Sequence, residues 1–182
     1  TLQIIVKMKI TNIELKKFKC FNETKLKLSK ITLLTGANSS GKSSLLYSIL
    51  AMLQSEKFPF FFLFNGRFVD LGSFEEISFA NIHNQAIEVS VDINVPLSYD
   101  YPGPLQLKTV WIENKKNKLP QLDELQILTK GLLIEIVKKE GKHYLSIIDN
   151  HEHGYFVGKL KERVLKITEI KNARYILFEK AG

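Results

Sequence analysis

The sequence predicts a mixed α/β fold with strong α+β character, in which a phosphate loop is followed by a substantial antiparallel β subdomain. Two observations support this prediction. Residues 36–43 read Gly-Ala-Asn-Ser-Ser-Gly-Lys-Ser, a complete G-x-x-x-x-G-K-[S/T] loop. After residue 86, short segments of alternating apolar and polar residues follow one another. The length of 182 residues suits one domain or one large lobe.

The phosphate loop has the flanking elements that its motif requires. Residues 31–35 are mostly apolar and predict a short buried strand, and a helix is expected at about residues 41–55. We therefore expect a strand, a loop and a helix in succession. The expected apolar face of the helix is formed by Leu45, Leu46, Ile49, Leu50 and Leu53.

Two further strands are expected before the loop, at residues 8–19 and 25–29. Asn65-Gly66 lies between apolar runs and predicts a hairpin over residues 63–69, because both residues tolerate positive φ. The phenylalanine-rich stretch 58–64 is then expected to pack on the core. That stretch is far shorter than the roughly 20 residues that a membrane-spanning helix needs, so no transmembrane segment is expected.

The second half of the chain predicts strands at residues 87–93, 107–112, 122–128, 132–137 and 144–148. Residues 163–180 mix helical and strand patterns and receive no assignment. We interpret residues 1–182 as a single partial lobe. It comprises a phosphate-loop core at about 8–85, a β-rich subdomain at about 86–160 and an unassigned end at 161–182.

Each residue type in the loop suits a polyphosphate. Gly36 and Gly41 allow the backbone dihedrals with which successive N–H groups curl around phosphate oxygens. Lys42 is expected to place its ammonium near the β- and γ-phosphates, Ser43 to offer a hydroxyl to Mg²⁺, and Ser44 to assist at the α-phosphate. The loop therefore predicts binding of a nucleoside triphosphate with Mg²⁺.

The composition adds two expectations. The net charge of +7 favours acidic partners. The single cysteine, Cys20, excludes an internal disulfide, fits a reducing cytoplasm and is interpreted as a packed small apolar residue. The early basic segment is either a nucleic-acid contact or a solvated face that attracts nucleotides, and the second alternative is favoured because bulk charge alone is weak support. Its lysines are Lys16, Lys17, Lys19, Lys25, Lys27 and Lys30.

The opening Phe18-Lys19-Cys20-Phe21, together with Gly-Ala-Asn-Ser-Ser-Gly-Lys-Ser-Ser at residues 36–44, resembles the N-terminal lobe of the SMC/RecF/OLD branch of ABC-type ATPases. Members of that branch are often labelled AAA-family ATPases. Residues 65–74 are similar to the bacterial OLD-type members. The resemblance implies that Asn38 lies beside the β/γ-phosphates and that Lys19 lies near the adenine or the α-phosphate. The implied nucleotide-binding residues are Lys19, Gly36, Asn38, Ser39, Ser40, Gly41, Lys42, Ser43 and Ser44, with Lys42 as the catalytic residue and Ser43 as the magnesium ligand.

The chain also departs from the pattern of that family. We find no Leu-Ser-Gly-Gly-like signature, and the best candidate for a Walker B strand, residues 144–150, carries Asn150 where the catalytic Glu belongs. A strand that runs into an Asp-Asn turn is the favoured interpretation of Asp149. His151-Glu152-His153 is interpreted as a surface turn rather than a metal site. The catalytic half of the ATPase is expected to lie outside these residues.

The resemblance implies an ATP-binding lobe that uses ATP and Mg²⁺ in the cytoplasm and works in DNA repair or phage defence. It implies pairing in a homodimer or with a second ATPase half, and a nuclease or DNA as further partners. ATP hydrolysis is expected only when a Walker B and signature half completes the site. The alternative is a non-catalytic module whose assembly with a partner ATPase or nuclease depends on nucleotide. A transport ATPase is a third and less favoured interpretation.

Overall fold

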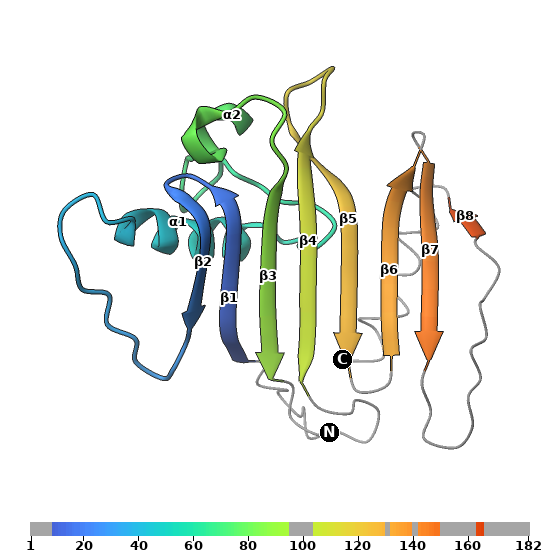
Figure 1. Ribbon diagram of the computed structural model, residues 1–182, viewed down its shortest axis with the longest axis horizontal. Helices are drawn as coiled ribbons and strands as arrows, with labels where there is room; N and C mark the ends of the chain where they lie inside the picture. The colour runs from blue at the N-terminus through green and yellow to red at the C-terminus, as the bar shows by residue number, and fades with distance from the viewer. Residues whose placement is uncertain (1–8, 95–103, 130–131, 140–141, 150–162, 166–182) are drawn as a thin grey trace. The chain divides into compact units, whose positions relative to one another are not determined.

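The computed structural model describes residues 9–94, 104–129, 132–139, 142–149 and 163–165. Its strands form one sheet in the order β2-β1-β3-β4-β5-β6-β7-β8 (Figure 1). The pairs β1–β2, β5–β6, β6–β7 and β7–β8 are antiparallel. The strands are β1 (Lys9–Phe18), β2 (Phe21–Lys27), β3 (Ile87–Asn94), β4 (Leu105–Glu113), β5 (Pro120–Thr129), β6 (Leu132–Lys139), β7 (Lys142–Asp149) and β8 (Arg163–Leu165), and the helices are α1 (Lys42–Gln54), α2 (Phe74–Ile77) and the 3-10 turn η1 (Phe79–Asn81).

Most predicted strands are confirmed. The two early strands become β1 and β2, and the five strands expected after residue 86 become β3 to β7. In β3 the residues Ile87, Val89 and Val91 are buried and alternate with more exposed neighbours, as a sheet with one covered face requires. Of the unassigned segment 163–180, only β8 falls within the described residues. The fold is thus a mixed α and β arrangement compatible with an α/β ATPase domain.

The chain divides into two compact units, and the division falls within β1, β3, β4 and β5. We call residues 12–90 and 109–123 the loop unit, because they contain the phosphate loop, both helices and the β1–β2 hairpin. The other unit comprises residues 1–11, 91–108 and 124–182. Its described core includes Leu125, Ile127, Ile134 and Ile136, which are buried on β5 and β6.

The core of the loop unit is aromatic. Phe62 is fully buried, and its ring centroid lies 4.7 Å from that of Phe64 and 5.5 Å from that of Trp111 on β4. Phe58 and Phe74 extend this cluster through contacts with Phe62 and Phe64, respectively. Offset and tilted aromatic pairs of this kind stabilise a core beyond the area that they bury. The expectation that the phenylalanine-rich stretch packs on the core is confirmed.

Gln54, the last residue of α1, organises the segment that carries this cluster. Its Nε2 donates hydrogen bonds to the carbonyl oxygens of Leu63 (2.8 Å) and Val69 (3.1 Å). Its Oε1 accepts from the backbone N–H groups of Phe68 (3.1 Å) and Val69 (3.0 Å). The side chain is 8% exposed, so these bonds form largely out of water. A buried carboxamide with both ends satisfied fixes residues 63–69 to the end of α1.

The predicted hairpin over residues 63–69 is wrong in its geometry. A single bridge joins Asn65 and Asp70, and the turn is closed by a hydrogen bond from the Gly66 N–H to the Val69 carbonyl. Neither Asn65 nor Gly66 has positive φ. Asn65 instead uses its side chain, whose Oδ1 accepts from the N–H groups of Leu71 and Gly72. Side-chain hydrogen bonds to the local backbone replace the primed turn that the Asn-Gly pair predicts.

The predicted strand at residues 31–35 is also wrong. These residues are irregular, and the side chains of Ile31 and Leu33 are 89% and 83% exposed. A strand needs a neighbouring strand to satisfy its backbone, and no strand of the described residues pairs with this segment. Apolar character alone therefore did not make this segment a strand.

The predicted helix is confirmed as α1, but its buried face differs from the expected one. Leu46 and Leu53 are 50% and 62% exposed, whereas Leu45, Ser48, Ala51 and Met52 are buried. The helix is apolar on several sides, so the sequence pattern does not decide which side faces the core. The small residues Ser48 and Ala51 face the core, and both are fully buried.

Helix α2 was missed by the sequence analysis although a local signal exists. Ser73 is its N-cap, and its Oγ accepts from the Glu76 N–H while the Glu76 carboxylate accepts from the Ser73 N–H at 2.7 Å. The Ser-x-x-Glu spacing of this capping box is readable in the sequence. These hydrogen bonds from the Ser73 backbone and side chain hold the pKa of Glu76 below its ordinary value of 4.5.

We predict that replacing Gln54 with Met lowers the free energy of unfolding by about 2–5 kcal/mol, because four backbone groups lose a buried partner. Urea unfolding followed by tryptophan fluorescence measures the change, since Trp111 lies in the adjoining cluster. Gln121→Met on β5 is the control and should change stability little. Equal effects of the two substitutions would contradict the organising role of Gln54.

We also predict that Ser73→Ala raises the pKa of Glu76 part of the way toward its ordinary value, because the hydrogen bond from the Ser73 hydroxyl to the carboxylate is lost while the one from the Ser73 backbone N–H is kept. Because the folded pKa is lowered, the cap stabilises the fold above about pH 4.5 and loses this effect as the pH falls through the folded pKa. NMR titration of the Glu76 side chain measures both values. The exposed Ser29→Ala substitution is the control and should leave the titration unchanged.

Candidate functional site

The phosphate loop turns directly into α1, which begins at Lys42. Gly41 caps the helix in the left-handed conformation with φ 91, and its carbonyl accepts the first helical hydrogen bond from the Leu45 N–H at 3.0 Å. Gly36 has φ 145, and Ser39 also adopts positive φ at 62. The glycines therefore occupy positions where a side chain would be strained. Residues 36–40 are exposed, so the loop is open to solvent.

The loop folds around the ammonium of its own lysine. Lys42 Nζ donates hydrogen bonds to the carbonyl oxygens of Gly36 (2.9 Å) and Ala37 (2.5 Å) and to Ser40 Oγ (3.3 Å). Of the candidate nucleotide-binding residues, the structure thus brings Gly36 and Ser40 together with Lys42. Three oxygen atoms surround the charge in an exposed position, and an entering anion would compete with them for the same ammonium.

Gly41 is also needed because the β1–β2 turn approaches it closely. A Cβ atom built on Gly41 would lie 2.6 Å from Phe21 Cζ and 2.8 Å from Cys20 Sγ. Both residues belong to the Phe18-Lys19-Cys20-Phe21 opening that carries the family resemblance. Cys20 is exposed, so its interpretation as a packed apolar residue is wrong. The structure therefore places the opening motif against the second glycine of the loop.

Lys19 lies in this turn, and it is tied to the region of α2. Its N–H donates to the Ile77 carbonyl at 2.6 Å, and its Nζ donates to the Leu71 carbonyl at 3.0 Å. An antiparallel bridge joins Phe18 and Ser78 beside these bonds. Both Lys17 and Lys19 have positive φ. The unusual backbone at Lys17 interrupts the alternation of buried and less buried residues along β1, so that Phe18 is buried instead of Lys17.

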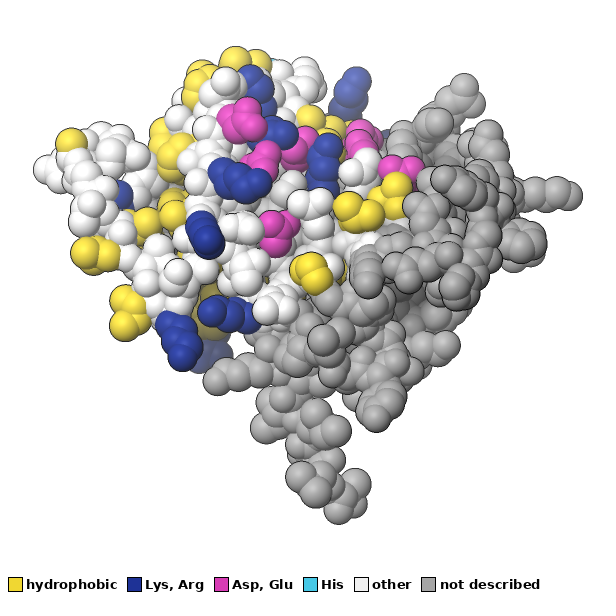
Figure 2. Space-filling model, turned by 60° about the horizontal axis from the view of Figure 1, so that its bottom comes forward, with side chains coloured by type: hydrophobic (Ala, Val, Ile, Leu, Met, Phe, Trp, Pro, Cys, Tyr) yellow, Lys and Arg dark blue, Asp and Glu magenta, His cyan; other side chains and the backbone are white. Residues whose placement is uncertain are grey.

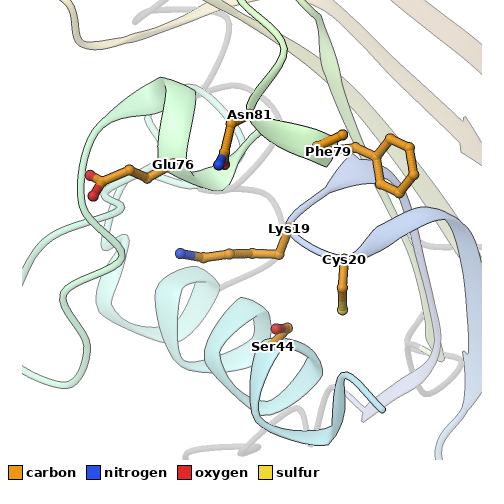
Figure 3. A pocket seen from close by; sticks show the side chains of 7 residues that line it. Lys19, Cys20, Ser44, Glu76, Phe79 and Asn81 are labelled. Atoms are coloured by element: carbon orange, nitrogen blue, oxygen red, sulfur yellow. The ribbon is translucent and has the colours of Figure 1, made fainter. Parts of the chain in front are cut away.

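An open hollow of about 440 Å³ lies between the β1–β2 turn, the start of α1 and the α2–η1 segment (Figure 3). All of these elements belong to the loop unit. The lining residues are Lys19, Cys20, Ser44, Glu76, Phe79, Ala80 and Asn81. Of the candidate nucleotide-binding residues, the hollow brings together Lys19 and Ser44, whereas the remaining candidates lie in the loop and the first turn of α1.

Most of the early lysines are engaged with neighbouring groups. Lys16 Nζ lies 2.8 Å from Glu88 and 3.2 Å from Glu14, and hydrogen bonds to these two carboxylates raise the pKa of Lys16. Lys25 also pairs with Glu14, and Lys17 donates to Asn22. In Figure 2 basic and acidic side chains are intermixed on the described face. This pairing favours the interpretation of the basic segment as a solvated face.

Ser43 of the loop is the metal ligand that the sequence predicts. Within the described ranges no group of three His, Cys, Asp or Glu side chains could hold a metal ion. His151–His153 falls outside the described residues, and for Asp149 only the backbone at the end of β7 is described. Ser43 lies exposed in the first turn of α1, and its role as a magnesium ligand stays a prediction.

A loop of this sequence and geometry at the start of a helix is typical of nucleotide-binding domains. A family model described as "AAA ATPase domain" matches residues 8–180, and the chain belongs to this family. Membership of the family supports nucleotide binding. A search of curated proteins gave no match. None of the helices in the described part of the chain is long and apolar enough to cross a membrane.

We predict that Gly41→Ala destabilises the loop unit for two reasons. A residue with a side chain in the left-handed conformation loses about 1–3 kcal/mol of stability, and the new methyl group would collide with Phe21. Combining it with Phe21→Ala should cost less than the sum of the two single substitutions. Urea unfolding of the four proteins gives this coupling, which we expect to be about 0.5–3 kcal/mol. Strictly additive effects would show that the Phe21 ring is not a reason for glycine at this position.

Proposed function

We propose that this chain is the ATP-binding lobe of an ABC-type ATPase of the SMC/RecF/OLD branch. The observation that carries the proposal is the loop at residues 36–43, which wraps its exposed lysine ammonium at the start of the 13-residue helix α1. The N-terminal end of such a helix carries unpaired N–H groups and a positive partial charge, which favour a bound anion. The family match over residues 8–180 supports the ATPase part of the proposal, and the branch is proposed from the resemblance of residues 18–21 and 36–44.

The residues present fit a magnesium–nucleotide. Lys42 supplies a compact positive charge for the β/γ-phosphates, and its present partners are neutral oxygens of the loop itself. Ser43 offers a hydroxyl oxygen, a ligand type that Mg²⁺ accepts. Asn38, Ser39 and Ser40 form the bend of the loop and complete the proposed phosphate cradle. Bound ATP would supply a transferable γ-phosphoryl group.

We further propose that hydrolysis requires a second ATPase half, contributed by a homodimer partner or by another chain segment. Phosphoryl transfer needs a group that positions water and charge that stabilises the transferred phosphoryl. The sequence contains neither a Leu-Ser-Gly-Gly-like signature nor a Walker B Asp-Glu pair that would supply these groups. Coupling to a nuclease or DNA in cytoplasmic DNA repair or phage defence is proposed from the resemblance of the opening motif and residues 65–74.

The alternative is a non-catalytic module that binds ATP in order to assemble with a partner ATPase or nuclease. The lack of a Walker B Asp-Glu pair in the sequence is compatible with this alternative too, because the pair supplies the carboxylate that activates water. The two functions differ in turnover after assembly. Hydrolysis by the completed complex supports the ATPase, and ATP-dependent assembly without hydrolysis supports the module.

We predict that Lys42→Ala weakens binding of Mg²⁺–ATP by about 10- to 100-fold, because a charge-assisted interaction with the phosphates is lost. Titration calorimetry on the parent and the variant measures the change. Lys30→Ala is the matched control, since Lys30 is an exposed lysine outside the loop and should leave the affinity almost unchanged. Equal affinities of the parent and the Lys42→Ala variant would contradict the proposed role of the loop.

A further inference from the structure

We propose that the free edge of β2 is a self-association surface, on which β2 of a second copy of the chain pairs in antiparallel orientation. This inference goes beyond the proposed function, because the contact does not use the phosphate loop. The sheet begins with β2, and no strand of the described residues pairs with its outer edge (Figure 1). An exposed edge strand presents unpaired N–H and C=O groups to which another strand can bind.

The edge of β2 is open to solvent along most of the strand. Its exposed residues are Asn22, Glu23, Lys25 and Lys27. The pair Phe18 and Phe21 closes a two-residue turn, and the directions of the backbone groups alternate along the strand from that pair. Residues 22, 24 and 26 therefore direct their N–H and C=O groups to the free edge, where a second strand would receive them.

The charges at the centre of β2 are complementary to themselves. Glu23 and Lys25 flank Thr24. Two antiparallel β2 strands centred on Thr24 thus place Glu23 of each copy opposite Lys25 of the other. Opposite charges directly across two strands stabilise the pairing, whereas like charges destabilise it. The two-fold symmetry of a dimer forms this contact twice.

The register also fits the backbone. With Thr24 at the two-fold axis, residue 24 pairs with its own copy and residue 22 with residue 26, so the outward-directed groups of both strands meet. Charged side chains on an edge disfavour strands that do not match them. The edge therefore selects a strand with a basic residue opposite Glu23 and an acidic residue opposite Lys25, and β2 itself has this pattern.

Both charged side chains are available for such a contact, since each is 63% exposed. Within the chain, Glu23 lies 3.9 Å from Lys16, and Lys25 lies 3.6 Å from Glu14. Lys16 is held more closely by Glu88 on β3, at 2.8 Å. Alternating charges thus lead from β3 across β1 to Glu23 on β2. Lys25 of the second copy continues this alternation by one strand.

The test measures the mass of the full chain by sedimentation equilibrium over a series of protein concentrations, without nucleotide. We expect a monomer–dimer equilibrium. Glu23→Lys and Lys25→Glu each place like charges at both cross-strand contacts, and each should weaken the dimer by about tenfold or more. The two substitutions change the net charge of +7 in opposite directions, so a general effect of charge would give opposite results.

Lys30→Glu is the matched control. Lys30 is an exposed lysine outside β2, and its substitution changes the charge by the same amount as Lys25→Glu. We expect it to leave the dimer almost unchanged.

Mixing the two variants separates the contact from damage to the fold. In a mixed pair, every cross-strand contact again joins opposite charges. Each variant alone should be mainly monomeric, whereas an equimolar mixture should dimerise again. A mixture that stays monomeric would contradict the proposed register.

The results that would overturn the inference differ from those that concern the loop. If the parent stays monomeric throughout, or if both charge variants dimerise as strongly as the parent, β2 does not pair with itself. If a dimer forms only with Mg²⁺–ATP and is lost in Lys42→Ala, the copies associate through the phosphate loop, and the proposed function stands while this inference fails.

Discussion

The buried carboxamide of Gln54 is the interaction on which much of the loop unit depends. It joins the end of α1 to the backbone of residues 63–69 through four hydrogen bonds. The aromatic cluster of Phe62, Phe64 and Trp111 packs beside this connection. Because α1 also carries the phosphate loop at its other end, the position of the loop is set by contacts at both ends of one helix.

The β1–β2 turn has the corresponding role at the start of α1. Phe21 and Cys20 occupy the space that any side chain at Gly41 would fill, and Lys19 holds the turn to Leu71 and Ile77. Two segments far apart in sequence, residues 18–21 and 71–78, are thereby attached to one another and to the loop. The resemblance pointed to residues 18–21 and 65–74, and the hydrogen bond from Lys19 Nζ to the Leu71 carbonyl joins these two segments.

The sequence predicted elements wherever local periodicity decides the structure. The helix after the loop and strands β3 to β7 were found in this way, because alternation and helical spacing reflect burial on one face. The segment 31–35 was misassigned because a strand also requires a neighbour, which the pattern of one segment does not reveal. The face of α1 was misassigned because Leu46 and Leu53 are as apolar as the residues that are buried.

The site was predictable only in part for the same reason. The loop motif is contiguous, so its residues could be named from the sequence. The hydrogen bond from Lys19 to the Leu71 carbonyl joins residues 52 positions apart, and a strand and a loop separate Phe21 from Gly41. Contacts between residues so distant in the sequence produce no periodic pattern in it. The Ser73 and Glu76 capping box did leave a local trace, and it marks the segment that leads to Asn81.

The contact between Phe21 and Gly41 has a consequence for the order in which this region folds. The β1–β2 hairpin closes through a two-residue turn, so its ladder forms at a small cost in chain entropy. The contacts of the loop with Phe21 join residues about 20 positions apart and form against that ladder. We therefore expect the hairpin to act as the template on which the loop acquires its shape during folding.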